Sequence, residues 1–445
     1  MRRELFGGTL GVVGERLEKG CFFFDGDILW CRILRYFFKS RNHKIMQNTQ
    51  HITNDLIYVG ASDRRLALFE NVYPVPRGVS YNSYVLLDEK AVLFDTVDAA
   101  VAQQFYENVE AALAGRKLDY VVVHHMEPDH AATLMDLLLR HPEATVVTTA
   151  KAAQMMEQFF GTKPAQLMAV KEGDTLATGA HTLVFTMAPM VHWPEVMMTY
   201  DSTAKVLFSA DAFGTFGALS GNLFADQMDF EHEWLSDARR YYINIVGKYG
   251  LQVQNVLKKA ATLDIQMICP LHGPVWRENL GWFIGKHDVW SRYEPEDKGV
   301  VIIYGSIYGH TEAAALRLGT LLAERGVKGI KAYDASHTHA SKLVAECFRA
   351  SHVVLASSTY NNGLFTPIEG LLADLKAHAW QKRTVALVEN GSWAPQGAKL
   401  MRAELEQMKD IAIVGEPVSL KSAATPAQEQ QLAALADQIV STLGE

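Results

Sequence analysis

The sequence contains few cysteines and no close cysteine pair. The four cysteines, Cys21, Cys31, Cys269 and Cys347, form no C-x-x-C motif. A disulfide framework and a cysteine-bound zinc or iron–sulfur site are therefore not expected. Low cysteine usage without pairing favours a reducing compartment, so we predict a cytoplasmic protein.

Long apolar runs and excess positive charge are also missing. No run reaches the roughly 18 apolar residues that a membrane helix requires, and the most hydrophobic stretch, residues 21–38, is interrupted by four charged residues. The formal net charge of -8 lacks the basic footprint of a general nucleic-acid binder. We therefore predict no membrane and no nucleic acid as partners. No G-x-G-x-x-G fingerprint for a nicotinamide dinucleotide occurs either.

The length of 445 residues exceeds one ordinary hydrophobic core, so we expect two domains. Residues 54–290 show the pattern of many short strands and few helices, whereas five strand–helix units alternate strictly beyond Gly299. The charged segment Ser291–Gly299 is the best linker candidate. We predict one domain over residues 46–293 and a second, a doubly wound parallel sheet, over residues 298–445.

The first 45 residues differ from the rest of the chain. They are basic and carry half of the cysteines, and a plausible strand begins soon after Met46. An export signal is disfavoured because the apolar stretch after Arg2-Arg3 is short and follows an acidic residue. We predict that residues 1–45 are an extension outside the core fold, such as an upstream start codon would add.

Histidines and carboxylates gather where predicted strands end. The stretch "VVVHHMEPDH" places two histidines and two carboxylates, spaced H-x-E-x-D-H, directly after an apolar run, and three more candidates follow later strands. Each residue alone is most often a turn or capping residue, but together they indicate a dinuclear metal site. Strand alternation turns His124 to the opposite side, so we interpret it as structural. The candidate metal ligands are His125, Glu127, Asp129, His130, His192, Asp211 and His272.

The ligand types restrict the metal. Two divalent ions carry four positive charges; three carboxylates return three, and one bridging hydroxide would neutralise the site. Coordination that is rich in oxygen, free of thiolate and includes imidazole suits non-haem iron or manganese, while zinc stays open because affinity alone does not discriminate.

Three loops of the second domain indicate a flavin site. Ser306–Glu312 joins a strand to a helix and offers hydroxyls and backbone N–H groups to a phosphate, without the lysine of a nucleoside-triphosphate loop. Ser357–Phe365 and Glu389–Gly397 follow later strands whose carboxyl ends share that edge. We predict that these loops bind FMN. The candidate residues are Ser306, Ile307, Tyr308, Gly309, His310, Thr311, Ser358, Thr359, Tyr360, Asn361, Asn362, Gly363, Asn390, Gly391, Ser392 and Trp393.

The ordered motifs "HMEPDH", "VHWPE", "SADAFG" and "CPLHGP" resemble the metallo-β-lactamase-like domain of flavodiiron proteins, also called A-type flavoproteins. The second half resembles their flavodoxin domain, so the resemblance spans residues from about 50 to 440. The resemblance rests most strongly on Glu127. Hydrolases of the superfamily usually have H-x-H-x-D-H, with a histidine at this position, and bind zinc. The resemblance implies an N-terminal αββα sandwich of mixed α+β type, followed by a C-terminal α/β flavodoxin-like sheet.

The same resemblance implies ligand roles. It implies that one iron is bound by His125, Glu127 and His192, and that Asp211 bridges the two ions. The second iron is then bound by Asp129, His130 and His272.

The activity implied is reduction of dioxygen to water, of nitric oxide to nitrous oxide, or of both, with electrons passing through FMN to the two irons. No cysteine pairs for a fused rubredoxin follow the flavodoxin-like half. The donor is therefore expected to be a separate rubredoxin or a reduced deazaflavin. The family also implies a head-to-tail homodimer, or a tetramer built from it.

Two alternatives stay open at this point. One is a dinuclear zinc hydrolase fused to a flavodoxin module, against which Glu127 argues. The other is an electron carrier whose metal half serves only for folding. The metal content of the purified protein distinguishes the three hypotheses.

Overall fold

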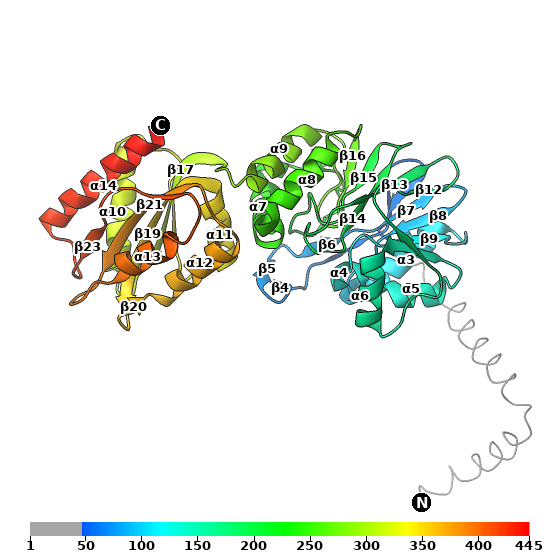
Figure 1. Ribbon diagram of the computed structural model, residues 1–445, viewed down its shortest axis with the longest axis horizontal. Coiled ribbons are helices and arrows are strands. Elements are labelled where there is room, and N and C mark those ends of the chain that lie inside the picture. Colours follow the sequence, from blue (N-terminus) through cyan, green and yellow to red (C-terminus); the bar gives the residue numbers. More distant parts are fainter. Residues whose placement is uncertain (1–46, 445) are drawn as a thin grey trace, which may run out of the picture. The chain divides into compact units, whose positions relative to one another are not determined.

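The computed structural model describes residues 47–444 (Figure 1). The predicted extension over residues 1–45 lies outside the described residues. Over the described part, no helix combines the length and the apolar composition that crossing a bilayer requires.

Two β-sheets form the N-terminal domain. The first sheet has the order β1-β2-β7-β8-β9-β10-β11 and the second the order β12-β13-β14-β15-β16. The strands of the first sheet are β1 (Gln50–His51), β2 (Leu56–Tyr58), β7 (Tyr84–Leu87), β8 (Ala91–Phe94), β9 (Tyr120–Val122), β10 (Thr145–Thr149) and β11 (Leu167–Val170). Those of the second are β12 (Thr175–Ala177), β13 (Thr182–Met187), β14 (Met197–Asp201), β15 (Val206–Phe208) and β16 (Met267–Cys269). Two short ribbons pair β3 (Ala61–Asp63) with β6 (Val79–Tyr81), and β4 (Leu68–Phe69) with β5 (Tyr73–Pro74).

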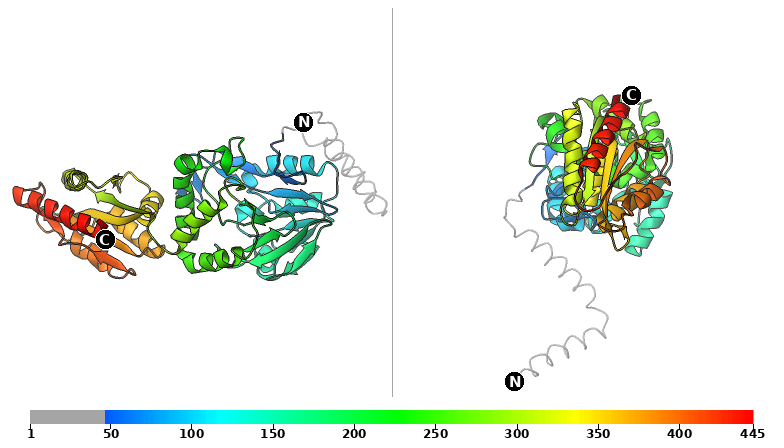
Figure 2. Two further views of the ribbon diagram at one scale, coloured as in Figure 1. Left: turned by 90° about the horizontal axis from the view of Figure 1, so that it is seen from above. Right: turned by 90° about the vertical axis from the view of Figure 1, so that its left-hand side faces the viewer.

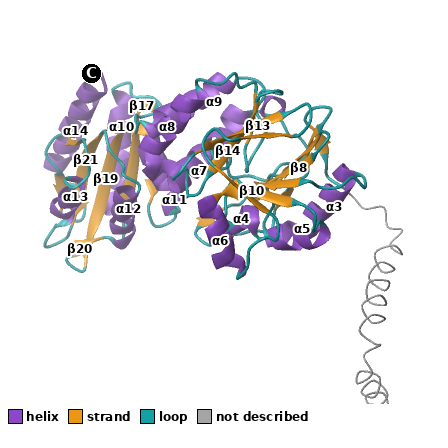
Figure 3. Cartoon of the chain, turned by 45° about the vertical axis from the view of Figure 1, so that its right-hand side comes forward, coloured by secondary structure: helices purple, strands orange, loops and turns teal. Residues whose placement is uncertain are grey.

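Alternation along the strands produces the layers. Val122 and Met197 pack into the core between the two sheets, whereas their neighbours Val121 and Met198 face the helices outside. Figure 3 shows these helices on both sides of the sheets. Outside the first sheet lie α3 (Ala102–Leu113), α4 (Pro128–Ala131), α5 (Leu134–Arg140) and α6 (Ala150–Phe160), and outside the second α7 (Leu235–Tyr241), α8 (Gly250–Ala260) and α9 (Leu280–Ser291). The αββα sandwich of the metallo-β-lactamase fold is thereby confirmed.

Apolar spacing over residues 238–260 is typical of a helix, but in the structure this helix is interrupted. α7 passes into the π-helical segment η4 (Tyr242–Val246) and the 3₁₀ turn η5 (Gly247–Tyr249) before α8 begins. At Gly250, a Cβ atom would lie 2.3 Å from the carbonyl oxygen of Ser291, so the start of α8 approaches the end of α9 too closely for any side chain. Apolar spacing predicts helix but not this change of hydrogen-bond period. Further short segments are the 3₁₀ turns η1 (Ala99–Val101) and η2 (Ala225–Gln227) and the π-helical η3 (Phe230–Trp234).

The C-terminal sheet is parallel, with the order β18-β17-β19-β21-β22. In chain order this is 2-1-3-4-5, the flavodoxin arrangement. Its strands are β17 (Asp297–Gly305), β18 (Lys331–Asp334), β19 (Ala350–Tyr360), β21 (Arg383–Asn390) and β22 (Ile411–Ile413); β20 (Gly363–Leu364) pairs with β19, and β23 (Val418–Leu420) with β21.

Helices cover both faces of this sheet. α10 (His310–Glu324) and α14 (Pro426–Gly444) pack together on one face, as Figure 2 shows from two further directions. The opposite face is covered by α11 (Ala340–Arg349), α12 (Thr366–Ala377) and α13 (Gly397–Leu405). The predicted alternation of five strands and helices is confirmed. α9 ends at Ser291 and β17 begins at Asp297, while the domain limits at residues 293 and 298 stay a prediction.

Candidate metal centre and flavin loops

The candidate metal ligands converge at one edge of the sandwich, where strands of both sheets end. His125 and Glu127 follow β9, His192 lies between β13 and β14, and Asp211 follows β15. His272 follows β16, the parallel neighbour of β15, and the remaining two ligands open α4. All seven residues are buried, and none is more than 8% exposed to solvent. The structure therefore brings together every predicted ligand.

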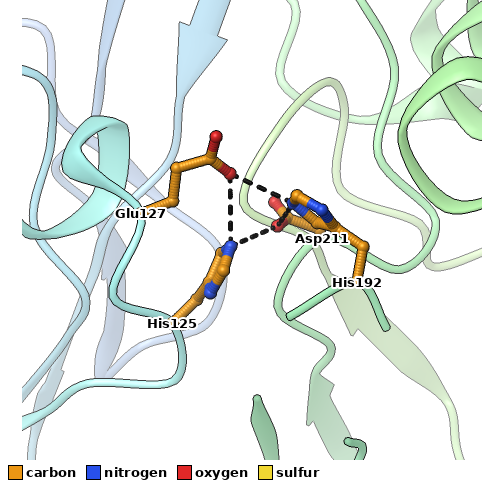
Figure 4. A group of neighbouring side chains, drawn as sticks. All are labelled: His125, Glu127, His192 and Asp211. Atoms are coloured by element: carbon orange, nitrogen blue, oxygen red, sulfur yellow. Dashed lines mark hydrogen bonds and ion pairs between the residues drawn. The ribbon is translucent and has the colours of Figure 1, made fainter. Parts of the chain in front are cut away.

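The first group contains His125, Glu127, His192 and Asp211, and their side chains point toward one another (Figure 4). Glu127 Oε2 lies 3.2 Å from His125 Nε2 and 3.0 Å from His192 Nε2. Asp211 Oδ2 lies 3.3 Å from His125 Nε2 and 3.4 Å from His192 Nε2. Two imidazole nitrogens and two carboxylate oxygens thus surround one point.

The second group contains Asp129, His130 and His272. Asp129 Oδ2 lies 3.3 Å from Nε2 of each histidine, and the two Nε2 atoms lie 3.1 Å apart. Asp211 turns its other oxygen, Oδ1, to this group, 3.1 Å from His130 Nε2. One carboxylate therefore faces both groups, which is the geometry of a bridging ligand.

The donors fit a pair of divalent ions. Ligand atoms about 2.0–2.2 Å from an ion in tetrahedral geometry lie roughly 3.3–3.6 Å apart, close to the separations within each group. Both oxygens of Asp129 are buried and accept no hydrogen bond. Because a buried carboxylate that makes no hydrogen bond is costly, a cation bound between the ligands would stabilise this arrangement.

The electrostatics of the site also favour a cation. Although burial alone would lower the pKa of His192, Asp211 and Glu127 raise it to about 9. Burial likewise lowers the pKa of His130, but Asp129 and Asp211 raise it to about 9. The carboxylates therefore hold protons on the imidazoles, and a divalent ion that binds here displaces them.

Two further groups orient the imidazoles, and sequence reasoning gave neither of them a role. Glu195 Oε1 lies 2.7 Å from His125 Nδ1, and the carbonyl oxygen of Ser80 lies 2.7 Å from His272 Nδ1. With the proton on Nδ1 of each ring, Nε2 is left free as a metal ligand. The only sequence signal for Glu195 is its place three residues after His192; Ser80 acts through its main chain, which no sequence pattern marks.

Neighbouring side chains close the site. The Tyr81 ring packs 5.9 Å from the His272 ring, and burial with the adjacent Glu127 carboxylate raises the pKa of Glu70 to about 8. His124 is separate from the ligands, as predicted: its Nε2 lies 2.7 Å from Thr199 Oγ1, and its ring stacks parallel to Phe94.

The three candidate flavin loops follow neighbouring strands of the C-terminal sheet. β17 and β19 are paired up to Gly305 and Ser357, and β19 and β21 up to Ser358 and Asn390. The loops therefore leave the same edge of the sheet. The Thr311 hydroxyl, at the start of α10, lies 2.8 Å from the Ser358 hydroxyl and joins the first loop to the second.

Each loop has a backbone feature that shapes it. In the first, the Gly309 N–H donates to Ser306 Oγ at 3.1 Å, just before α10 begins. In the second, Asn361 and Asn362 take φ values of 50° and 61° in a two-residue hairpin turn. In the third, a Cβ atom on Gly391 would meet Pro395 Cα at 2.7 Å.

This edge fits a phosphorylated planar ring. The start of α10 offers backbone N–H groups to a phosphate, while Tyr308 is 91% exposed and Trp393 89% exposed. Large aromatic rings so open to solvent, on loops at the carboxyl edge of a parallel sheet, are suited to stack against a flat ligand.

Comparison with known proteins agrees with both halves. The model of the ODP family beta lactamase matches residues 79–273. The anaerobic nitric oxide reductase flavorubredoxin of Vibrio vulnificus is 32% identical over 78% of this chain and 70% of its own length. The chain belongs to the flavodiiron protein family.

Solved flavodiiron structures cover both domains together. The rubredoxin oxygen:oxidoreductase of Desulfovibrio gigas superposes with a TM-score of 0.83 and 30% identity, over 89% of this chain and 98% of that one. The flavodiiron protein of Giardia intestinalis gives a TM-score of 0.82 at 26% identity, with the same coverage. The predicted family and fold are confirmed, and the chain is an enzyme of the flavodiiron oxidoreductase family.

Proposed function

We propose that this flavodiiron protein reduces dioxygen to water, nitric oxide to nitrous oxide, or both. Electrons enter from an external donor, such as a rubredoxin or a reduced deazaflavin, and pass through FMN to two non-haem irons. The observation that carries the proposal is the double ligand cluster joined by Asp211, in a chain that also has a flavodoxin-like domain. Two ferrous ions and one reduced FMN together supply four electrons, the number that dioxygen needs to become two waters; two nitric oxide molecules need two.

The candidate ligands form two groups, one for each ion. His125, Glu127 and His192 would hold one iron, and Asp211, whose two oxygens face the two groups, would be a ligand to both ions. The other iron is held by Asp129, His130 and His272. Glu195 and the Ser80 carbonyl keep the rings of His125 and His272 turned toward the ions.

The flavin loops have separate roles in the proposal. The residues from Ser306 to Thr311 hold the FMN phosphate at the start of α10. The residues from Ser358 to Gly363 and from Asn390 to Trp393 enclose the ring. We further propose that the protein acts in the cytoplasm as a head-to-tail homodimer, in which the flavin of one subunit serves the irons of the other.

Cofactor analysis and turnover test the function. We expect close to two irons and one FMN per chain. A rubredoxin reduced under anaerobic conditions and then supplied with a measured amount of either gas should support consumption of dioxygen or nitric oxide. Zinc at full occupancy after growth with ample iron, without gas reduction, would instead support the hydrolase alternative.

A variant of Glu127 sharpens this test. Glu127→His restores the H-x-H-x-D-H pattern of the zinc hydrolases, so we expect zinc to replace iron and gas reduction to be lost while FMN stays bound. If the variant keeps two irons and its activity, Glu127 does not determine the metal, and the argument that rests on it is wrong.

A further inference from the structure

The ring of His272 lies inside a cage of three aromatic side chains. Its centroid is 5.5 Å from that of Phe69, 5.9 Å from that of Tyr81 and 5.4 Å from that of Tyr241. Each of the three rings meets the imidazole edge to face, and each residue is at most 3% exposed. Close packing therefore holds this ligand ring in one orientation, in addition to the hydrogen bond at its Nδ1.

A fourth ring supports two members of the cage from outside. The centroid of Phe216 lies 5.5 Å from that of Phe69 and 5.1 Å from that of Tyr241. The guanidinium carbon of Arg240 lies 4.5 Å from the centroid of the Phe216 ring, on the face of that ring. Such a cation–π contact is attractive, and more so when it is removed from water, as Arg240 is at 7% exposure.

Arg240 is held in turn by α11, one of the helices that cover the C-terminal sheet. Its Nη1 donates to the hydroxyl of Ser341 at 3.3 Å. The Asn244 side-chain amide donates to the Ser341 carbonyl oxygen at 3.1 Å and to the Arg240 carbonyl oxygen at 2.7 Å. All three residues are buried. One serine in the first turn of α11 thus anchors the segment of α7 and η4 that also carries Tyr241.

The charge of Arg240 is weakly compensated. Its Nη2 lies 3.5 Å from the Asp237 carboxylate, so this ion pair is long, and burial lowers the pKa of the guanidinium. An apolar side chain of similar length would fill the same space without the cost of removing a charge from water. The position of the guanidinium between Ser341 and Phe216 offers a reason for its presence.

We propose that Arg240 is a positioning residue for the metal centre. It transmits the packing of α11 through Phe216 to the aromatic cage, and so strengthens binding of the ion at the second ligand group. An imidazole that is already held in the binding orientation loses little further freedom when the ion binds, so a looser cage means weaker binding. The proposal rests on the proposed function, because it concerns the affinity of that same site for its second ion.

The first ligand group has a different aromatic neighbour. The ring of Trp193 lies 5.0 Å from that of His125 and 6.1 Å from that of His192. Loosening the cage around His272 should therefore weaken the binding of one ion and spare the other. General destabilisation of the fold would release both ions together.

Stepwise removal of iron from the full-length holoprotein tests the proposal. For Arg240→Ala we expect one of the two irons to leave at a roughly tenfold lower chelator concentration than in the wild type, the lower end of the effect of groups that support a ligand. The other iron should leave at the wild-type concentration. Iron content per chain, measured across the titration, then shows a plateau at one iron.

Two milder variants keep the test informative if Arg240→Ala does not fold. Ser341→Ala removes only the hydroxyl that anchors Arg240, so the same iron should leave at a roughly threefold lower chelator concentration. Arg240→Lys keeps a cation for the Phe216 ring and should recover part of the loss. Arg140→Ala is the control, because the exposed Arg140 lies 4.2 Å from the centroid of the Tyr106 ring, outside the first sheet. It should retain both irons as the wild type does.

A double variant tests the transmission itself. If Arg240 and Ser341 act along one chain of contacts, Arg240→Ala with Ser341→Ala should lose iron no more readily than Arg240→Ala alone. Losses that add, unchanged iron retention in Arg240→Ala, or release of both irons together overturn the proposal and leave the proposed function intact. A wild-type protein that does not bind a second ion rejects the proposed function itself, and this result is seen before any substitution is made.

Discussion

Nδ1 of His125 lies 2.7 Å from Oε1 of Glu195, on the side of the ring opposite the predicted ion. The same carboxylate oxygen accepts a hydrogen bond from the N–H of Met126 at 3.0 Å. Glu195 thereby fixes both the ring and the main chain of the first ligand, and its charge makes the ring a stronger donor to the metal.

Replacing this carboxylate should weaken metal binding without removing a ligand. For Glu195→Gln we expect metal to be lost to a chelator at a roughly 10- to 100-fold lower chelator concentration than in the wild type, the usual effect of losing such a partner. Metal content after titration with the chelator measures this. Glu231→Gln, an exposed carboxylate on η3, is the matched control. Equal metal retention in the two variants would show that Glu195 only packs against His125.

The ligands themselves could be predicted from the sequence, because each is marked by the residues that directly precede it in the chain. His125, Asp211 and His272 each come three residues after the end of a short apolar strand, β9, β15 and β16 respectively. Strand ends on a rigid scaffold are where site residues concentrate. The pairing of Glu195 with His125 joins residues 70 positions apart, and the Ser80 carbonyl is a main-chain atom, so neither has a local pattern.

Part of the fold could likewise be predicted from the sequence, and part could not. Strict alternation of strands and helices predicts the flavodoxin-like sheet, because parallel strands need crossover helices. The break between α7 and α8 could not be predicted, because it depends on Gly250 lying against the carbonyl of Ser291. That contact is set by packing of separate helices, and the amphipathic pattern of residues 238–260 contains no sign of it.

A buried ion pair next to β17 should contribute strongly to stability. Glu296 accepts from Arg239 Nε at 2.5 Å and from Trp290 Nε1 at 3.0 Å. Although burial alone would raise the pKa of Glu296, Arg239 and its other partners lower it to about 2. Glu296→Ala leaves the buried Arg239 without this partner, so we expect the free energy of unfolding to fall by about 3–5 kcal/mol.

Denaturant unfolding of the full chain checks this value. The control is Glu294→Ala, which removes an ion pair with Lys382 in which both side chains are more than one-third exposed. For this pair we expect a loss of at most about 1 kcal/mol. Equal losses in the two variants would contradict the role assigned to the buried pair.

The buried imidazole of His287 predicts a loss of stability in weak acid. Its pKa is lowered by burial from 6.5 to about 4. Below pH 6.5 the unfolded chain therefore takes up a proton that the folded chain does not, so stability is present above that pH and declines toward pH 4. The decline from pH 7 to pH 5 amounts to about 2 kcal/mol for this one group.

His287→Leu should remove that part of the pH dependence. Loss of metal at low pH lowers the stability of wild type and variant alike. The measured quantity is therefore the free energy of unfolding of the variant minus that of the wild type, determined once at pH 7 and once at pH 5. We expect this difference to move by about 2 kcal/mol in favour of the variant as the pH falls. A difference that does not change with pH would mean that the pKa of His287 is not lowered in the folded protein.

The proposed dimer predicts that two inactive variants restore each other. One variant, His192→Ala with Asp211→Ala, removes ligands of the first ion and the bridge. The other, Ser306→Asp, places a carboxylate where Ser306 Oγ now accepts from the Gly309 N–H, at the start of α10, and so repels the FMN phosphate. Each should be inactive alone, and each should keep the cofactor of its unaltered domain.

Differently tagged copies of the two variants, expressed together, allow the mixed dimer to be isolated. In a head-to-tail dimer one of its two flavin–metal pairs is intact, because the pair is formed by opposite subunits and two-fold symmetry creates two such pairs from one interface. We therefore expect about half of the wild-type turnover per dimer. Mixed dimers that contain the expected iron and FMN but remain inactive would show that electrons pass within one subunit. A Ser306→Ala partner, which keeps the phosphate site uncharged, is the control for loss of activity through the substitution itself.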